Sequence, residues 1–102
     1  MDNLFVHGAI TSALLAQAVE WLQSKTGLGA HSIFLGQVRA DETPAGPVTA
    51  IHYTAYEDMA REKAAEICAA VVEAYQLELL EIYHSLGTVK TGEISLLVLA
   101  CS

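Results

Sequence analysis

The segment EISLLVLAC, from Glu93 to Cys101, predicts a strand that other parts of the fold cover on both faces. Successive side chains of a strand point to opposite faces, so a strand with one face in water has a polar residue at every second position. Here the apolar positions fall on both faces: Ile94, Leu96, Leu97, Val98 and Leu99. Because only Ser102 follows, we expect a further segment or another subunit to complete the cover of this strand.

The clearest periodicity precedes that strand and predicts a long amphipathic helix, which begins near Glu57 and Asp58. These two carboxylates suit the positive end of a helix dipole. One face carries Ala60, Ala64, Ile67, Cys68, Val71 and Tyr75, and the charged residues Arg61, Glu62, Glu66 and Glu73 fall largely on another. A helix with such an apolar face packs on a sheet.

Four more strands and a shorter helix are predicted around these two elements. The strands are Leu4–His7, His31–Val38, Val48–Tyr56 and Leu79–Leu86, with a surface loop at Ala40–Pro47 and a turn region at Gly87–Gly92. The helix is capped by Thr11 or Ser12, presents Leu15, Ala18, Val19 and Leu22 at helical spacing, and stops before Gly27 and Gly29. The order β-α-β-β-α-β-β predicts one α+β domain over residues 1–102, with a mostly antiparallel or mixed sheet covered on one face by the two helices.

The composition narrows the classes of function. Five Lys and Arg against twelve Asp and Glu give a net charge of −7, which would repel a nucleic-acid backbone. The apolar runs fall far short of the ~20 residues of a membrane span, and Met1-Asp2-Asn3 shows no secretory signal. We therefore expect a cytoplasmic protein that binds neither nucleic acid nor membrane. With 53% hydrophobic and 17% charged residues, part of its surface is expected to face another chain.

Residue types that commonly build metal or nucleophile sites are scattered along the chain. Cys68 and Cys101 each lie in an apolar stretch, where a reduced thiol packs as a small hydrophobe. The four histidines are His7, His31, His52 and His84, none of them paired at metal-ligand spacing, and three of them fall inside predicted strands. Neither a Gly-rich phosphate loop nor a nucleophile elbow is present. We predict no metal and no cofactor.

Arg39 is the exception among the charged residues. It follows a predicted strand and precedes a Pro- and Gly-containing loop, where a guanidinium fork can hold a phosphate or a carboxylate. The competing interpretation is an exposed ion pair with Asp41 or Glu42. Local features alone favour the ion pair, because one arginine makes a poor anion pocket.

Three segments occur in the order and spacing of one known family. The first is Gly29-Ala30 leading to Phe34-Leu35-Gly36-Gln37-Val38-Arg39, the second is Tyr53-Thr54-Ala55-Tyr56-Glu57-Asp58-Met59-Ala60, and the third is His84-Ser85-Leu86-Gly87 followed by Val89, Gly92 and Glu93. Together they cover nearly the whole chain. They resemble the large, catalytic subunit of molybdopterin synthase, which is also subunit 2 of the molybdopterin-converting factor.

This resemblance implies an α/β hammerhead-type fold, a homodimer, and a heterotetramer with a small ubiquitin-like sulfur carrier. The carrier's C-terminal thiocarboxylate would transfer sulfur to cyclic pyranopterin monophosphate to form molybdopterin, a step of molybdenum cofactor biosynthesis. Arg39 matches the family's substrate-binding arginine, and Gln37 and Val38 match the positions beside it. The resemblance therefore implies that these three residues bind the substrate.

The chain also departs from the family pattern. The family's Ser-x-His-Arg segment and its two catalytic lysines have no counterpart after Ala100, Ser85 replaces an arginine, and Gln37 stands where a lysine is common. We therefore expect a C-terminally truncated relative, assign no catalytic residue, and leave open whether it is an enzyme. The alternatives are an inactive homologue that serves for dimerisation or carrier binding, and a ferredoxin-like regulatory domain that binds a small molecule.

Overall fold

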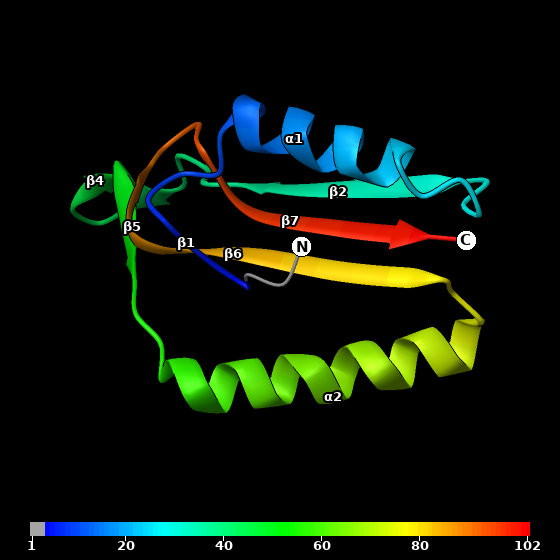
Figure 1. Cartoon of the computed structure of the whole chain (residues 1–102). Helices are drawn as coiled ribbons and strands as arrows, with labels where there is room; N and C mark the ends of the chain where they lie inside the picture. The colour runs from blue at the N-terminus through cyan, green and yellow to red at the C-terminus, as the bar shows by residue number, and fades with distance from the viewer. Residues whose placement is uncertain (1–3) are drawn as a thin grey trace.

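The computed structural model describes residues 4–102. Its elements follow the chain as β1 (Phe5–His7), α1 (Ser12–Gln23), β2 (His31–Gln37), β3 (Glu42–Thr43), β4 (Gly46–Pro47), β5 (Ala50–Tyr53), α2 (Glu57–Tyr75), β6 (Leu79–Lys90) and β7 (Ile94–Cys101). Figure 1 shows the long strands β2, β7 and β6 running between the two helices.

The sheet is built around β6 and β7. β6 pairs with β1 in parallel and with β5 and β7 antiparallel, and β7 pairs on its other side with β2, also antiparallel. The strand order is β1-β6-β7-β2, while β3 and β4 form a separate small hairpin. The predicted α+β fold with a mixed sheet and two helices is confirmed.

The core lies between α1 and one face of the sheet. Thr11 caps α1, because its Oγ1 accepts a hydrogen bond of 3.2 Å from the Leu14 amide. The buried cluster consists of Ile10, Ala18, Leu22, Tyr83, Leu97, Leu99 and Cys101. Burial of each large apolar side chain in such a cluster contributes about 1.5–3 kcal/mol, so this face of β6 and β7 holds α1 in place.

The second helix lies on the other side of the sheet from α1 (Figure 1), which corrects the expectation that both helices cover one face. α2 contacts β6, but none of its nineteen residues is buried. Of its predicted apolar face, Ile67 and Tyr75 are exposed. The helix ends at Gln76, which adopts a left-handed conformation with φ 53°.

Because α2 lies beside β6, the strand β7 is covered unequally. Its residues alternate between buried positions, which face α1, and half-buried positions on the opposite side. The expectation of cover on both faces is therefore fulfilled on one face and only in part on the other.

Two predicted boundaries are wrong, and pairing between distant segments explains both. The region from Gly87 to Lys90 is a strand rather than a turn, because it pairs with β5: Gly87 lies opposite Tyr53 and Lys90 opposite Ala50. The predicted loop at residues 40–47 contains the β3–β4 hairpin, in which Thr43 pairs with Gly46. Glycine tolerates the φ of 103° that this turn requires at Gly46.

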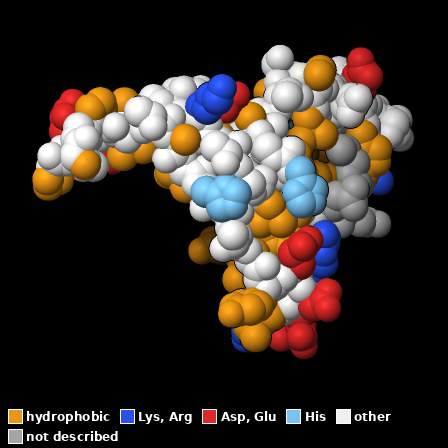
Figure 2. Space-filling view, turned by 90° about the vertical axis from the view of Figure 1, so that its left-hand side faces the viewer, with side chains coloured by type: hydrophobic (Ala, Val, Ile, Leu, Met, Phe, Trp, Pro, Cys, Tyr) orange, Lys and Arg blue, Asp and Glu red, His pale blue; other side chains and the backbone are white. Residues whose placement is uncertain are grey.

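The molecule is extended for its length. Its principal extents are 49 × 28 × 21 Å and its radius of gyration is 15.1 Å, whereas a compact domain of 100 residues has a radius of about 13 Å. Figure 2 shows two projecting arms on either side of an open hollow, with hydrophobic side chains exposed on both. Much apolar surface is therefore left for contacts with other molecules.

Candidate functional site

A cleft of about 550 Å³ lies where β2 ends and β5 begins. It is lined by Gln37, Val38, Arg39, Asp41, Val48, Ala50, Ile51 and Tyr53. The ladder between β2 and β7 shifts register between Gly36 and Gln37, and such a bulge re-aims the side chains that follow it. The three residues predicted for the site, Gln37, Val38 and Arg39, therefore lie together at one cleft.

The backbone that carries Arg39 is held firmly. Val38 is buried, its amide donates a hydrogen bond of 3.0 Å to the Glu93 carbonyl, and its carbonyl accepts one of 2.9 Å from the Gly92 amide. Val38 thus anchors the end of β2 to the turn between β6 and β7. Its neighbours Gln37 and Arg39 are exposed.

The guanidinium of Arg39 is held by Asp41 in a forked ion pair. Arg39 Nε lies 2.6 Å from Asp41 Oδ1, and Nη2 donates a hydrogen bond of 3.2 Å to Oδ2. The Arg39 side chain is 83% exposed. The ion pair considered from the sequence is therefore present, and an anion that binds here must share or displace the carboxylate of Asp41.

Tyr53 is a cleft residue that local sequence features did not single out. Its hydroxyl donates a hydrogen bond of 3.1 Å to Ser95 Oγ, and its ring meets the His84 ring edge-on at a centroid distance of 4.9 Å. Tyr53 and His84 also line a neighbouring hollow of about 370 Å³. Tyr53 therefore forms the wall between two adjacent hollows. Its position depends on contacts with β6 and β7, which are distant from β5 in the sequence.

His84 has a defined proton arrangement when neutral. Its Nδ1 lies 2.7 Å from the Ser85 carbonyl oxygen, which can only accept a hydrogen bond, so Nδ1 carries the proton and Nε2 can accept. The neighbouring Ser85 is fully buried and its hydroxyl has no partner among residues 4–102. Because position 85 holds a serine where the family pattern has an arginine, it brings no positive charge.

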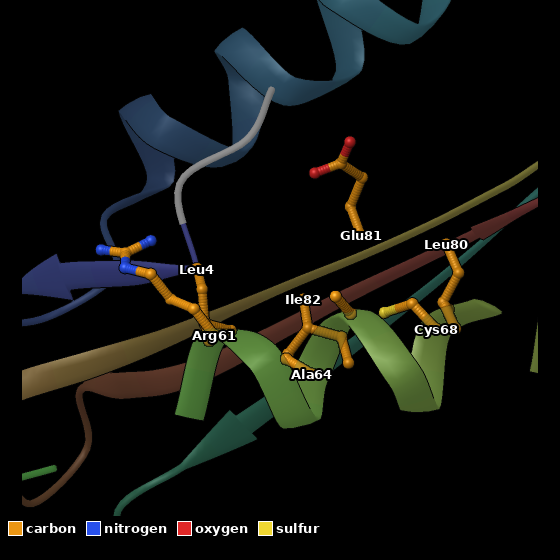
Figure 3. A pocket seen from close by; sticks show the side chains of 8 residues that line it. Leu4, Arg61, Ala64, Cys68, Leu80, Glu81 and Ile82 are labelled. Carbon is orange, nitrogen blue, oxygen red and sulfur yellow. The ribbon is translucent and has the colours of Figure 1, made fainter. Parts of the chain in front are cut away.

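A third hollow, of about 290 Å³, separates α2 from β6. Figure 3 shows Cys68 and Ala64 of α2 facing Leu80 and Ile82 of β6. Burial, and next the charge of Glu81, raises the pKa of the Cys68 thiol above its ordinary value. A protonated thiol is a weak nucleophile, so this surrounding lowers the reactivity of the Cys68 thiol.

Three of the remaining cations within the described range, Arg61, Lys25 and Lys63, have partners outside the first cleft. Arg61 lies 5.2 Å from the centre of the Phe5 ring and 3.9 Å from Glu57, and the ammonium of Lys25 lies over the Trp21 ring. Lys63 pairs with Glu66, and Lys90 lies opposite Ala50 in the β5–β6 ladder. Arg39 is therefore the arginine that residues 4–102 place at the first cleft.

Within residues 4–102, no group of three or more His, Cys, Asp or Glu side chains is arranged to hold a metal ion. Over the same residues, no helix combines the length and apolarity required to cross a bilayer.

Known proteins resemble this chain in sequence and in fold. The molybdopterin synthase catalytic subunit of Drosophila willistoni is 34% identical to it over 87% of this chain and 24% of its own length. The corresponding protein of Sclerotinia sclerotiorum is 34% identical over 72% of this chain and 37% of its own. The chain thus spans about a quarter to a third of the curated relatives that it matches.

Two solved structures share the fold over the whole chain. A complex of subunits 1 and 2 of the molybdopterin-converting factor from Helicobacter pylori contains a chain with a TM-score of 0.80 and 20% identity, of which 66% is covered. Molybdopterin synthase from Staphylococcus aureus gives a TM-score of 0.79 at 23% identity, with 71% covered. The family model described as MoaE protein matches residues 9–102. This chain therefore belongs to the MoaE protein family.

Proposed function

We propose that this chain acts in molybdenum cofactor biosynthesis, in the transfer of sulfur from a thiocarboxylated ubiquitin-like carrier to cyclic pyranopterin monophosphate. Membership of the MoaE family supports the pathway. The observation that carries the substrate assignment is the cleft at the end of β2, where the exposed guanidinium of Arg39 stands on an anchored backbone.

The chemistry of this reaction requires positive charge. The pterin phosphate and the thiocarboxylate are both anions, and fixed cations lower the cost of bringing them together and stabilise charge as sulfur attacks. Arg39 supplies a planar fork that fits a phosphate, with Gln37 beside it as a hydrogen-bonding neighbour. Asp41 already neutralises part of that charge, so we propose that further cations come from outside these residues.

The proposed partners are the small carrier subunit and a second copy of this chain, which together make a heterotetramer in the cytoplasm. The Helicobacter pylori structure, a complex of subunits 1 and 2, supports a small-subunit partner. The extended shape and the unburied α2 support protein contacts in general, because monomers rarely expose large contiguous apolar patches.

Replacement of Arg39 by alanine tests the substrate assignment. We expect Arg39→Ala to weaken binding of cyclic pyranopterin monophosphate roughly ten- to hundredfold, since a hydrogen bond to a charged group contributes about 1.5–3 kcal/mol. Titration calorimetry measures the affinity, and circular dichroism checks the fold. Arg61→Ala, an arginine outside the first cleft, is the matched control.

Asp41→Asn completes this experiment. It removes the competing carboxylate, so pterin binding should become tighter than in the wild type. Equal affinities of the Arg39→Ala and Arg61→Ala variants would remove Arg39 from the site.

A second candidate is a binding module that docks the carrier without catalysing sulfur transfer. It is favoured by the ion pair between Arg39 and Asp41, which leaves the first cleft with little net positive charge. Incubation with thiocarboxylated carrier and pterin separates the candidates. Dithiolene formation supports the transferase, and carrier binding without conversion supports the module.

A further inference from the structure

The hollow of about 370 Å³ on the far side of Tyr53 from the first cleft, which we call the second hollow, differs from that cleft in its chemistry. Its walls include Leu86 and the aromatic rings of Phe5, Tyr53 and His84. Of the described residues that line it, none is Lys, Arg, Asp or Glu. Concave, mostly apolar surfaces with a few polar groups, of about 300–1,000 Å³, are typical of small-molecule sites. The second hollow has this composition and this size.

Three strands hold the aromatic rings of the second hollow in place. Phe5 of β1 lies opposite His84 of β6, and Tyr53 of β5 lies opposite Gly87. The Tyr53 and His84 rings meet edge-on, with an interplanar angle of 84°, and the Tyr53 hydroxyl is held by its hydrogen bond to Ser95. Because these rings are positioned before a ligand arrives, less conformational freedom is lost on binding.

His84 gives the second hollow its hydrogen-bonding character. The contact of 2.7 Å between Nδ1 and the Ser85 carbonyl keeps the proton of the neutral imidazole on Nδ1, which makes Nε2 an acceptor. Nε2 accepts no hydrogen bond from residues 4–102. An aromatic hollow with one unused acceptor suits a flat heterocycle that carries N–H donors along its edge.

We propose that the second hollow binds the aminopyrimidinone ring of the pterin substrate. The rings of Phe5 and Tyr53 pack against this heterocycle, and His84 Nε2 accepts a hydrogen bond from its ring N–H or its amino group. His84 is thereby a specificity-determining residue. This inference deepens the proposed function and rests on it.

The two ends of the substrate match the order of the two hollows. Cyclic pyranopterin monophosphate carries its phosphate at one end of a fused ring system and the aminopyrimidinone ring at the other. The guanidinium of Arg39 lines the first cleft, the imidazole of His84 lines the second hollow, and Tyr53 stands between them. A phosphate contact cannot distinguish one phosphate ester from another, whereas a site that pairs with a ligand N–H rejects analogues that lack it.

Fluorescence titration with pterin, which carries no phosphate, tests the second hollow separately from Arg39. His84→Phe keeps an aromatic ring and removes the acceptor, so the dissociation constant for pterin should rise about three- to tenfold. His52→Phe is the matched control, because His52 lies on β5 outside the second hollow, with its Nδ1 3.0 Å from Thr88 Oγ1. It should leave the dissociation constant unchanged, and circular dichroism checks the fold of both variants.

A ligand without donors separates recognition by His84 from a general change in the shape of the hollow. N,N-Dimethyllumazine has the same fused rings, but methyl groups replace its N–H donors. The wild type should bind pterin more tightly than this analogue, and His84→Phe should lose that preference. Tyr53→Leu should weaken both ligands alike, since the aromatic wall it removes does not depend on donors.

The outcomes separate this inference from the proposed function. Equal pterin affinities of the His84→Phe and His52→Phe variants, or a preference for pterin that survives in His84→Phe, would overturn the role of His84. If His84→Phe does not fold, Tyr53→Leu decides, and an unchanged affinity for pterin would overturn the site. A chain that binds pterin as expected but forms no dithiolene with the thiocarboxylated carrier would overturn the transferase and leave the second hollow as a pterin site.

Discussion

The forked ion pair between Arg39 and Asp41 sets the energetics of the first cleft at the level of single residues. Both side chains are largely exposed, and exposed pairs of this kind contribute only about 0–1 kcal/mol to stability. The pair can therefore open for an anionic ligand at small cost.

Cys101 makes stability depend on pH. Burial, and next the charge of Glu81, raises the pKa of this core thiol above its ordinary value of 9.0. The unfolded chain then loses the proton at a lower pH than the folded chain, so the stabilisation is complete below pH 9 and is lost as pH rises through the folded pKa. The loss is at most about 1.4 kcal/mol per pH unit.

Urea denaturation of the wild type and of Cys101→Ala at pH 7, 9 and 10 measures this effect. The variant should be less stable at neutral pH, and the gap should narrow above pH 9. Titration of tyrosines and lysines is common to both proteins and cancels in the comparison. A gap that stays constant over this range would contradict the assignment.

At the level of elements, α1 is secured at both its cap and its apolar face. The hydrogen bond from the Leu14 amide to Thr11 Oγ1 satisfies a donor that the helix itself leaves unpaired. Thr11→Ala should lower the free energy of unfolding by about 1 kcal/mol, whereas Thr11→Ser, which keeps the hydroxyl, should not. Urea denaturation of both variants and of the wild type measures these free energies. Equal stabilities of Thr11→Ala and the wild type would show that the cap contributes nothing.

Elements that local sequence determines were predicted well, and those that depend on distant pairing were not. The cap at Thr11 and the start of β2 at His31 follow from local residue preferences. Gly87 was expected in a turn, because glycine disrupts isolated strands, yet pairing with β5 places it inside β6.

The same distinction applies to the candidate site. Arg39 and its ion pair with Asp41 could be predicted because the two residues lie two positions apart in the chain. The place of Tyr53 in the cleft could not be predicted, because its hydrogen bond to Ser95 joins residues that are 42 positions apart in the chain.

At the level of the whole molecule, the fold agrees with membership of the MoaE family. Few side chains outside the cluster under α1 are buried. The resemblance to the molybdopterin synthase large subunit, first seen in three short segments, is confirmed by the MoaE match over residues 9–102. The helix α1 packs on the buried hydrophobic cluster, whereas α2 lies against the sheet and none of its own residues is buried. Surfaces left this open are suited to assembly.

The pairing pattern of the sheet also determines when it can form during synthesis. Every ladder of the main sheet includes β6 or β7, so β1, β2 and β5 remain without their strand partners until the last quarter of these residues has left the ribosome. Contacts between such distant segments form slowly. A fragment of residues 1–78 should therefore show a helical signal by circular dichroism but no signal of the main sheet. The apolar β2 would be exposed to chaperones throughout that interval.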